Sequence, residues 1–145
     1  QLGDVMKESA QAGISFIRSI ADQYKIGPEF FQENDIHVHI PEGAVPKDGP
    51  SAGITMATAM LSAIIKKPVR ADVAMTGEIT LRGRVLPIGG LKEKLLAARY
   101  AKIKEVLVPA ENRVDVEELD QEILDGLKIS FVDTMTDVLH RALSK

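Results

Sequence analysis

The alternation of helix-type and strand-type patterns along the 145 residues constrains the fold more than any other feature. Apolar side chains that recur every three to four residues are typical of a helix, and strict alternation or a short apolar run is typical of a strand. The patterns alternate without a repeat or a linker, so we predict one α/β domain with a mixed sheet, spanning residues 1–145. The predicted helices cover 4–24, 52–66, 91–102, 115–127 and 134–143, and the predicted strands cover 36–40, 73–79, 80–88 (with a hairpin turn at Arg82-Gly83), 105–108 and 129–132.

Composition excludes several classes of protein. The chain has no Cys, so it forms no disulfide and no thiolate metal site, and any covalent catalysis must use oxygen or nitrogen. The uncharged apolar stretch 53–65 is shorter than the roughly 18 apolar residues that span a membrane. A net charge of -3 without a basic run argues against nucleic acid. We therefore expect a soluble protein with neither a membrane nor a nucleic-acid partner.

The boundary between a Gly/Pro-rich loop and a helix at Ser51 is the most informative local feature. Residues 46–50 predict a loop, and the following serine stands at the start of the helix 52–66. Backbone N–H groups and the helix dipole favour negative charge at such a position, so Ser51 is a candidate nucleophile with room for an oxyanion beside it. The alternative is an ordinary helix N-cap, where serine is common.

A nucleophilic serine needs a base, and the histidines give no support for one. His37 and His39 lie on the same face of the predicted strand 36–40, and His140 lies in the terminal helix. Their spacing does not favour a triad, and two histidines two residues apart lack the third ligand of a metal site. We predict neither a catalytic histidine nor a bound metal.

Lys94 is the alternative base, and helix geometry separates it from its neighbour Lys92. At about 100° per residue, Lys94 falls on the same face as Ala98 and Ala101. Lys92 instead falls beside Arg99. A lysine on a small apolar face loses hydration, which disfavours the ammonium and favours the amine that a general base needs. The other interpretation is a lysine whose stem covers apolar surface while its charge stays in water.

Three segments together resemble the proteolytic domain of the ATP-dependent Lon proteases. They are 47–53 (KDGPSAG), 76–83 (TGEITLRG) and 86–94 (LPIGGLKEK), and the similarity extends from 2–9 to the C-terminal helix. The resemblance implies a Ser-Lys dyad in which Ser51 is the nucleophile and Lys94 the base, in agreement with the helix geometry. It further implies that Thr76 holds the lysine by a hydrogen bond.

The resemblance also carries expectations about fold, assembly and setting. It implies a fold similar to ribosomal protein S5 domain 2, a hexameric ring, unfolded polypeptide as substrate, and a site surrounded by Asp48, Glu78 and the loop 41–50. No phosphate-binding loop occurs, so we expect no cofactor in this domain, with ATP and Mg²⁺ used by an ATPase domain outside these residues. Because the first residue is Gln1 and no signal peptide follows, we expect a segment of a longer protein. We expect it in the bacterial cytoplasm, with the mitochondrial matrix as the alternative.

Two other functions remain open at the level of sequence. An anion- or nucleotide-binding module with the S5-type fold would explain Ser51 and Gly53 but would leave Lys94 and Thr76 without a role. A catalytically silent domain that acts in ring assembly is the other alternative. Of the two acidic residues, Asp48 is either a loop residue that folds toward the serine or a solvated turn residue. Glu78 either pairs with a basic residue of a neighbouring subunit or is exposed at a strand end.

Overall fold

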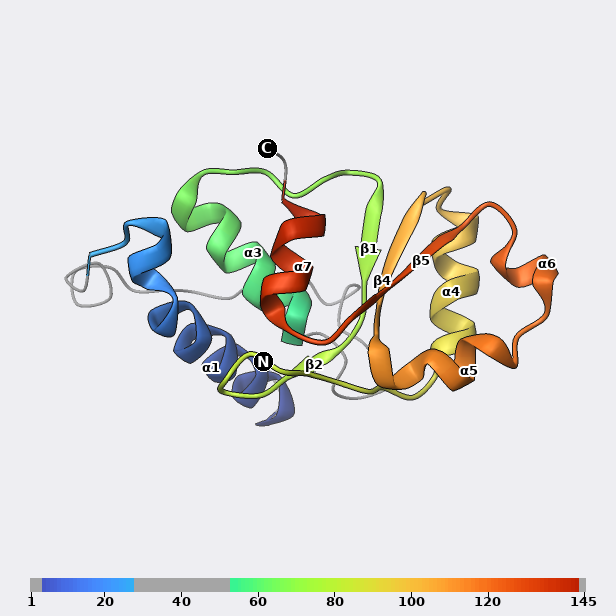
Figure 1. Cartoon of the computed structure of the whole chain (residues 1–145), viewed down its shortest axis with the longest axis horizontal. Helices are drawn as coiled ribbons and strands as arrows, with labels where there is room; N and C mark the ends of the chain where they lie inside the picture. Colours follow the sequence, from blue (N-terminus) through green and yellow to red (C-terminus); the bar gives the residue numbers. More distant parts are fainter. Residues whose placement is uncertain (1–3, 28–52, 144–145) are drawn as a thin grey trace.

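The computed structural model describes residues 4–27 and 53–143, and their helices and strands alternate along the chain (Figure 1). This confirms the predicted α/β class, whereas the S5-type label stays a prediction. The helices are α1 (Asp4–Ser19), η1 (Ala21–Tyr24), α3 (Gly53–Ile65), α4 (Leu91–Tyr100), η3 (Ala110–Asn112), α5 (Arg113–Glu117), α6 (Gln121–Leu124) and α7 (Met135–Ala142). The strands are β1 (Val73–Met75), β2 (Glu78–Ile79), β3 (Val85–Leu86), β4 (Glu105–Pro109) and β5 (Lys128–Val132).

The described strands form two separate sheets. One has the order β1-β4-β5, and both of its pairings are parallel. In its register Glu105 of β4 lies between Val73 and Lys128. The other sheet is the antiparallel hairpin of β2 and β3. The described strands therefore include both parallel and antiparallel pairings, as predicted. The two kinds of pairing occur in separate sheets and not in one mixed sheet.

Helices cover both faces of the parallel sheet, with α1, α3 and α7 on one face and α4, α5 and α6 on the other (Figure 1). The side chains of the central strand alternate between the two layers, as the period of two in a strand dictates. Leu107 belongs to the hydrophobic cluster of α1, α3 and α7, whereas Val106 and Val108 belong to that of α4 and α5. A strand that is buried on both faces reads in sequence as a continuous apolar run.

The hairpin and the last helix form as the sequence predicts. The turn closes with hydrogen bonds from Gly83 N to Thr80 O (2.9 Å) and from Thr80 N to Arg84 O (2.9 Å), and Gly83 has a positive φ of 87°. In α7 the Thr134 hydroxyl accepts from Asp137 N, and the Asp137 carboxylate accepts from Thr134 N in return. This reciprocal capping box fixes the start of the helix.

Three of the sequence predictions are wrong in detail. The helix predicted over 4–24 ends at Ser19 and is followed by the separate 3-10 helix η1. The single helix predicted over 115–127 is two short helices, α5 and α6, because Asp120 has the extended angles φ −63° and ψ 143°. The single strand predicted over 73–79 is interrupted at Gly77, whose φ of 153° is one that residues with a side chain rarely adopt. The chain there leaves the parallel sheet and enters the hairpin. The strand predicted over 36–40 lies outside the described residues.

None of the helices within residues 4–27 and 53–143 is long and apolar enough to cross a membrane.

Candidate active site

The start of α3 is packed tightly against the segment between β1 and β2. Ile54 N donates a hydrogen bond to Gly77 O at 3.1 Å. Gly53 is buried, and a Cβ at this position would lie 2.7 Å from Ile79 Cγ2 and 2.9 Å from Ile79 N. Gly53 comes two residues after Ser51, so this contact fixes the beginning of the helix that follows the predicted nucleophile. Ser51 itself, Asp48, the loop 41–50, His37 and His39 lie outside the described residues.

Glu78 lies at this contact, and the interpretation of it as an exposed strand-end carboxylate is wrong, whereas its pairing with a neighbouring subunit stays a prediction. The residue is half-buried, and its Oε2 accepts a hydrogen bond from the Ser9 hydroxyl of α1 at 2.7 Å. Its Oε1 accepts from Ile79 N at 3.0 Å and would meet a Cβ placed on Gly53. The carboxylate thus connects α1 with the start of α3 within one chain. Its hydrogen bond to Ser9 joins residues 69 positions apart, and its other oxygen lies beside Gly53.

Thr76 is buried at the carboxyl end of β1 and leaves a polar atom unpaired. Its backbone N–H donates to Leu107 O at 3.1 Å, which continues the pairing of β1 with β4. Its hydroxyl has no hydrogen-bond partner among the described residues, although the residue is only 5% exposed. The bond to a lysine that the family resemblance implies is therefore not formed in this structure. A buried hydroxyl without a hydrogen-bond partner lowers the stability of a fold by about 1–3 kcal/mol. Such groups are rare in native proteins, so a role for the Thr76 hydroxyl is to be expected.

Lys94 lies in the first turns of α4 and folds back over the start of its helix. It is half-buried whereas Lys92 is exposed, as the helix-face geometry predicts. Its Nζ donates to the carbonyl of Gly89 at 3.2 Å. Gly90 lies between that carbonyl and the helix with a φ of 68°, a left-handed conformation that favours glycine. The two glycines thus turn the chain so that a carbonyl meets the lysine amine.

The sequence analysis missed a residue that holds this turn in place, Asn112 at the end of η3. Its Oδ1 accepts from Ile88 N at 2.9 Å, and its Nδ2 donates to Ile88 O at 2.9 Å. The Nδ2 also donates to Asp115 Oδ2 at 2.7 Å. Asn112 is only 2% exposed. The available signal was an amide three residues after a fully buried strand, where a buried polar side chain must find partners.

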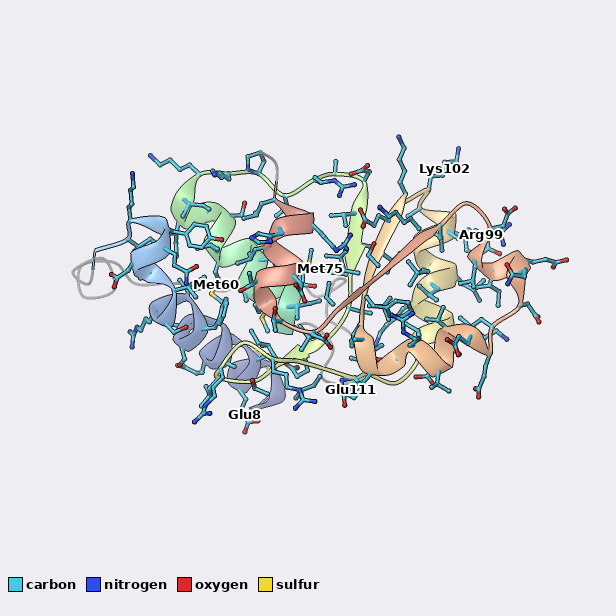
Figure 2. The ribbon with its side chains drawn as sticks, in the orientation of Figure 1. Glu8, Met60, Met75, Arg99, Lys102 and Glu111 are labelled. Carbon is cyan, nitrogen blue, oxygen red and sulfur yellow. The ribbon has the colours of Figure 1, made fainter. Side chains whose placement is uncertain are left out.

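These parts share one edge of the parallel sheet. The carboxyl ends of β1 and β4 and the starts of α3 and α4 all lie on the lower side of the molecule in Figure 1. Glu111, next to Asn112 in the chain, lies on the same side in Figure 2. Ligand sites of parallel α/β folds are found at the carboxyl ends of the strands. The fold therefore defines an α/β domain with a candidate site at this edge.

Neither a histidine nor a metal cluster accompanies the site in the part of the chain that the structure describes. His140 is exposed on α7. Within 4–27 and 53–143, no three His, Asp or Glu side chains gather in a way that could hold a metal ion.

Comparison with known proteins assigns the domain to a family. The model of the Lon protease (S16) C-terminal proteolytic domain matches residues 1–145, and the chain belongs to this family. It is 71% identical over 143 residues to the Lon protease of Lachnoclostridium phytofermentans. The aligned residues make up 99% of this chain and 18% of that protein. It is 60% identical over 145 residues to the Lon protease of Clostridioides difficile, covering 100% of this chain and 18% of the relative. It is also 60% identical over 143 residues to the Lon protease of Aquifex aeolicus, covering 98% and 18%.

Membership in this family confirms the resemblance drawn from the sequence and the expectation of an enzyme, a serine-type peptidase domain. The chain spans 18% of the length of each of these three relatives. We therefore treat the activity of the full-length protein as a proposal.

Proposed function

We propose that this domain is the proteolytic core of an ATP-dependent protease and that it hydrolyses peptide bonds in unfolded polypeptides. Ser51 is the nucleophile and Lys94 the general base. The observation that carries the proposal is the placement of Lys94: it is half-buried at the start of α4, on the same side of the molecule as the start of α3, which follows Ser51 in the chain. The family to which the chain belongs supports the same chemistry at the level of a peptidase.

The reaction proceeds through an acyl-enzyme. The neutral amine of Lys94 takes the proton from the Ser51 hydroxyl as its oxygen attacks the scissile carbonyl carbon. Backbone N–H groups at or next to Ser51 stabilise the oxyanion, a contribution of about 3 kcal/mol for one donor. The lysine ammonium then protonates the leaving amine, and water hydrolyses the ester with Lys94 again taking a proton.

Thr76 supports the base in this mechanism. Its hydroxyl is buried and unpaired, whereas the Lys94 amine is held by the carbonyl of Gly89. We assign to Thr76 a second hydrogen bond, which holds the amine together with the Gly89 carbonyl when Lys94 points toward Ser51. That bond would also remove the cost of the unpaired hydroxyl.

The whole protein is proposed to be larger than this domain. The 18% coverage of the relatives supports a longer chain. We propose that the rest of this chain includes an ATPase domain that uses ATP and Mg²⁺ and delivers unfolded polypeptide. We propose self-association into a hexameric ring and a location in the bacterial cytoplasm, in keeping with the bacterial relatives.

The test compares three variants of the intact protein, with casein as the unfolded substrate and ATP present. Ser51→Ala and Lys94→Gln should abolish cleavage, and Lys92→Gln, the matched control on the exposed face of α4, should retain most of it. Reaction of wild type with a fluorophosphonate should label Ser51, and this labelling separates the peptidase from a silent ring module and from a nucleotide-binding module. Cleavage that survives Ser51→Ala, or equal losses at the two lysines, would refute the assignment.

A further inference from the structure

We propose that Asn112 is a positioning residue for the general base. Its side-chain amide fixes Ile88, and Ile88 in turn fixes the neighbouring carbonyl of Gly89 that holds the Lys94 amine. The inference rests on the proposed role of Lys94 and adds a residue that touches neither the substrate nor the reacting atoms.

The amide of Asn112 pairs with Ile88 as a neighbouring strand would. It accepts from the N–H and donates to the C=O of the same residue, both at 2.9 Å. Two hydrogen bonds to one residue restrain its peptide planes more than either bond does alone. The carboxylate of Asp115 accepts the remaining N–H at 2.7 Å. Because a carboxylate accepts but does not donate, this contact also selects the orientation of the amide that suits Ile88.

The side chain of Ile88 packs against the cluster of α4 and α5, but the two residues that follow it have little to restrain them. Two glycines follow Ile88, and glycine has the greatest backbone freedom of all residues. A Cβ placed on Gly89 would meet no described atom within 4 Å, so side-chain packing does not fix that position. The Gly89 carbonyl therefore keeps its direction chiefly because Ile88, on one side, is clamped by a buried amide and α4, on the other, begins at Leu91.

Asn112 also links the lysine to the part of the site around α3. It ends the short helix η3, which follows Pro109 at the end of β4. Thr76 N donates to Leu107 O of β4 at 3.1 Å, and the next residue, Gly77, accepts the hydrogen bond from Ile54 N through its carbonyl oxygen. A contiguous path of contacts thus runs from the start of α3, through the carboxyl ends of β1 and β4, to the lysine.

Positioning of this kind matters because proton transfer is sensitive to distance. A displacement of about 1 Å at a reacting group can lower the rate on the order of a hundredfold. A lysine side chain has many rotamers, and a fixed carbonyl selects among them. Loss of the clamp should therefore reduce turnover and leave substrate binding largely unchanged.

The test measures kcat and KM of the intact protein separately, with a fluorogenic peptide, at a temperature well below unfolding. Asn112→Ala removes both bonds to Ile88, and we expect kcat to fall about ten- to a hundredfold with KM within about twofold. Amide exchange at Ile88 should accelerate in the same variant, because its N–H loses a buried acceptor. Thr134→Ala weakens the cap of α7 and removes none of the hydrogen bonds to Ile88 or Lys94, so it is the control for general destabilisation and should keep its kcat.

A second variant covers the case in which Asn112→Ala does not fold. Asn112→Asp keeps the acceptor for Ile88 N and loses the donor to Ile88 O, and a decrease in kcat with KM unchanged is again expected. A folded variant of either kind that turns over like Thr134→Ala would overturn the positioning role. Lys94→Gln tests the proposed function separately, because activity in that variant would refute the dyad. If Lys94→Gln is inactive and Asn112→Asp keeps the kcat of wild type, only the role of Asn112 is refuted.

Discussion

At the scale of single residues, the contact between Gly53 and Glu78 shows how backbone space is reserved beside the site. Gly53 is a poor helix former, yet it begins α3 because the Ile79 backbone and the Glu78 carboxylate occupy the place of its missing Cβ. The carboxylate lies against a helix N-terminus, where the helix dipole favours negative charge. Its bond to Ser9 holds it there.

Gly53→Ala tests this reading. Alanine is the better helix former by about 1 kcal/mol, but a methyl group here would meet Ile79 N at 2.9 Å, and backbone cannot easily retreat. We expect the free energy of unfolding, measured by urea titration, to fall by about 1–3 kcal/mol.

Gly13→Ala in α1 is the matched control. Its Cβ would meet the terminal methyl of Met60 at 2.8 Å, the far end of a flexible side chain between α1 and α3 (Figure 2). We expect this variant to be neutral or slightly more stable than wild type, since a methionine adjusts readily. A Gly53→Ala protein as stable as Gly13→Ala would contradict the close contact at the start of α3.

At the scale of elements, α7 is a helix that local sequence specifies and tertiary packing then uses. Its capping box involves only residues three positions apart, Thr134 and Asp137. Its buried face carries Met135, Val138 and Leu139 into the cluster shared with α1 and α3. The helix thus begins where its own sequence dictates and packs where the parallel sheet leaves an uncovered face.

Thr134→Ala removes the side-chain acceptor of Asp137 N at the start of α7. We expect a loss of about 1 kcal/mol in the free energy of unfolding. Thr134→Ser keeps the hydroxyl and should recover most of the loss. Thermal unfolding of the three proteins at one pH measures the difference, and equal midpoints for alanine and threonine would show that the cap does not contribute.

At the scale of the whole molecule, a charged network ties the opposite edge of the parallel sheet together. Glu105 of β4 is only 4% exposed and accepts hydrogen bonds from Arg70 (2.8 Å) and Ser130 (2.5 Å). Arg70 also pairs with Asp72 at 3.1 Å and donates to the carbonyl of Arg141 at 2.9 Å. The network therefore connects the start of β1, both other strands and the end of α7.

The network makes stability depend on pH. Burial by itself would raise the pKa of Glu105, but the hydrogen bonds from Ser130 and Arg70 outweigh it and hold that pKa below its ordinary value. The hydrogen bond from Arg70 likewise lowers the pKa of Asp72. Carboxylates with a lowered pKa in the folded state contribute stability above their unfolded pKa, about 4, and that contribution is lost as the pH falls through the folded pKa.

We therefore expect the free energy of unfolding to decrease on acidification below about pH 4.5. Glu105→Gln should lower stability at pH 7 by about 2 kcal/mol, since it removes a charged acceptor from a buried site, and should flatten the acid part of the profile. Urea unfolding between pH 3 and pH 7 measures both effects. Glu117→Gln, at an exposed position of α5, is the control, and an unchanged acid slope in Glu105→Gln would exclude the network as its source.

Elements whose cause is local can be predicted from the amino-acid sequence alone. Helical periodicity predicts α1 and α3, the hydroxyl at Thr134 predicts the start of α7, and 100° per residue places Lys94 and Lys92 on different faces of α4. The motif segments predict the family that the comparisons confirm.

Contacts between residues far apart in the sequence depend on how the folded chain packs. Ser9 finds Glu78 across 69 positions, Asn112 finds Ile88 across 24, and the charge of Glu105, inside a strand predicted from apolar residues, is compensated by Arg70 at 35 positions. Periodicity describes neighbours along one element, whereas these partners are brought together by layer packing and strand register. The positions of the side chains around Lys94 are therefore a property of the folded molecule as a whole.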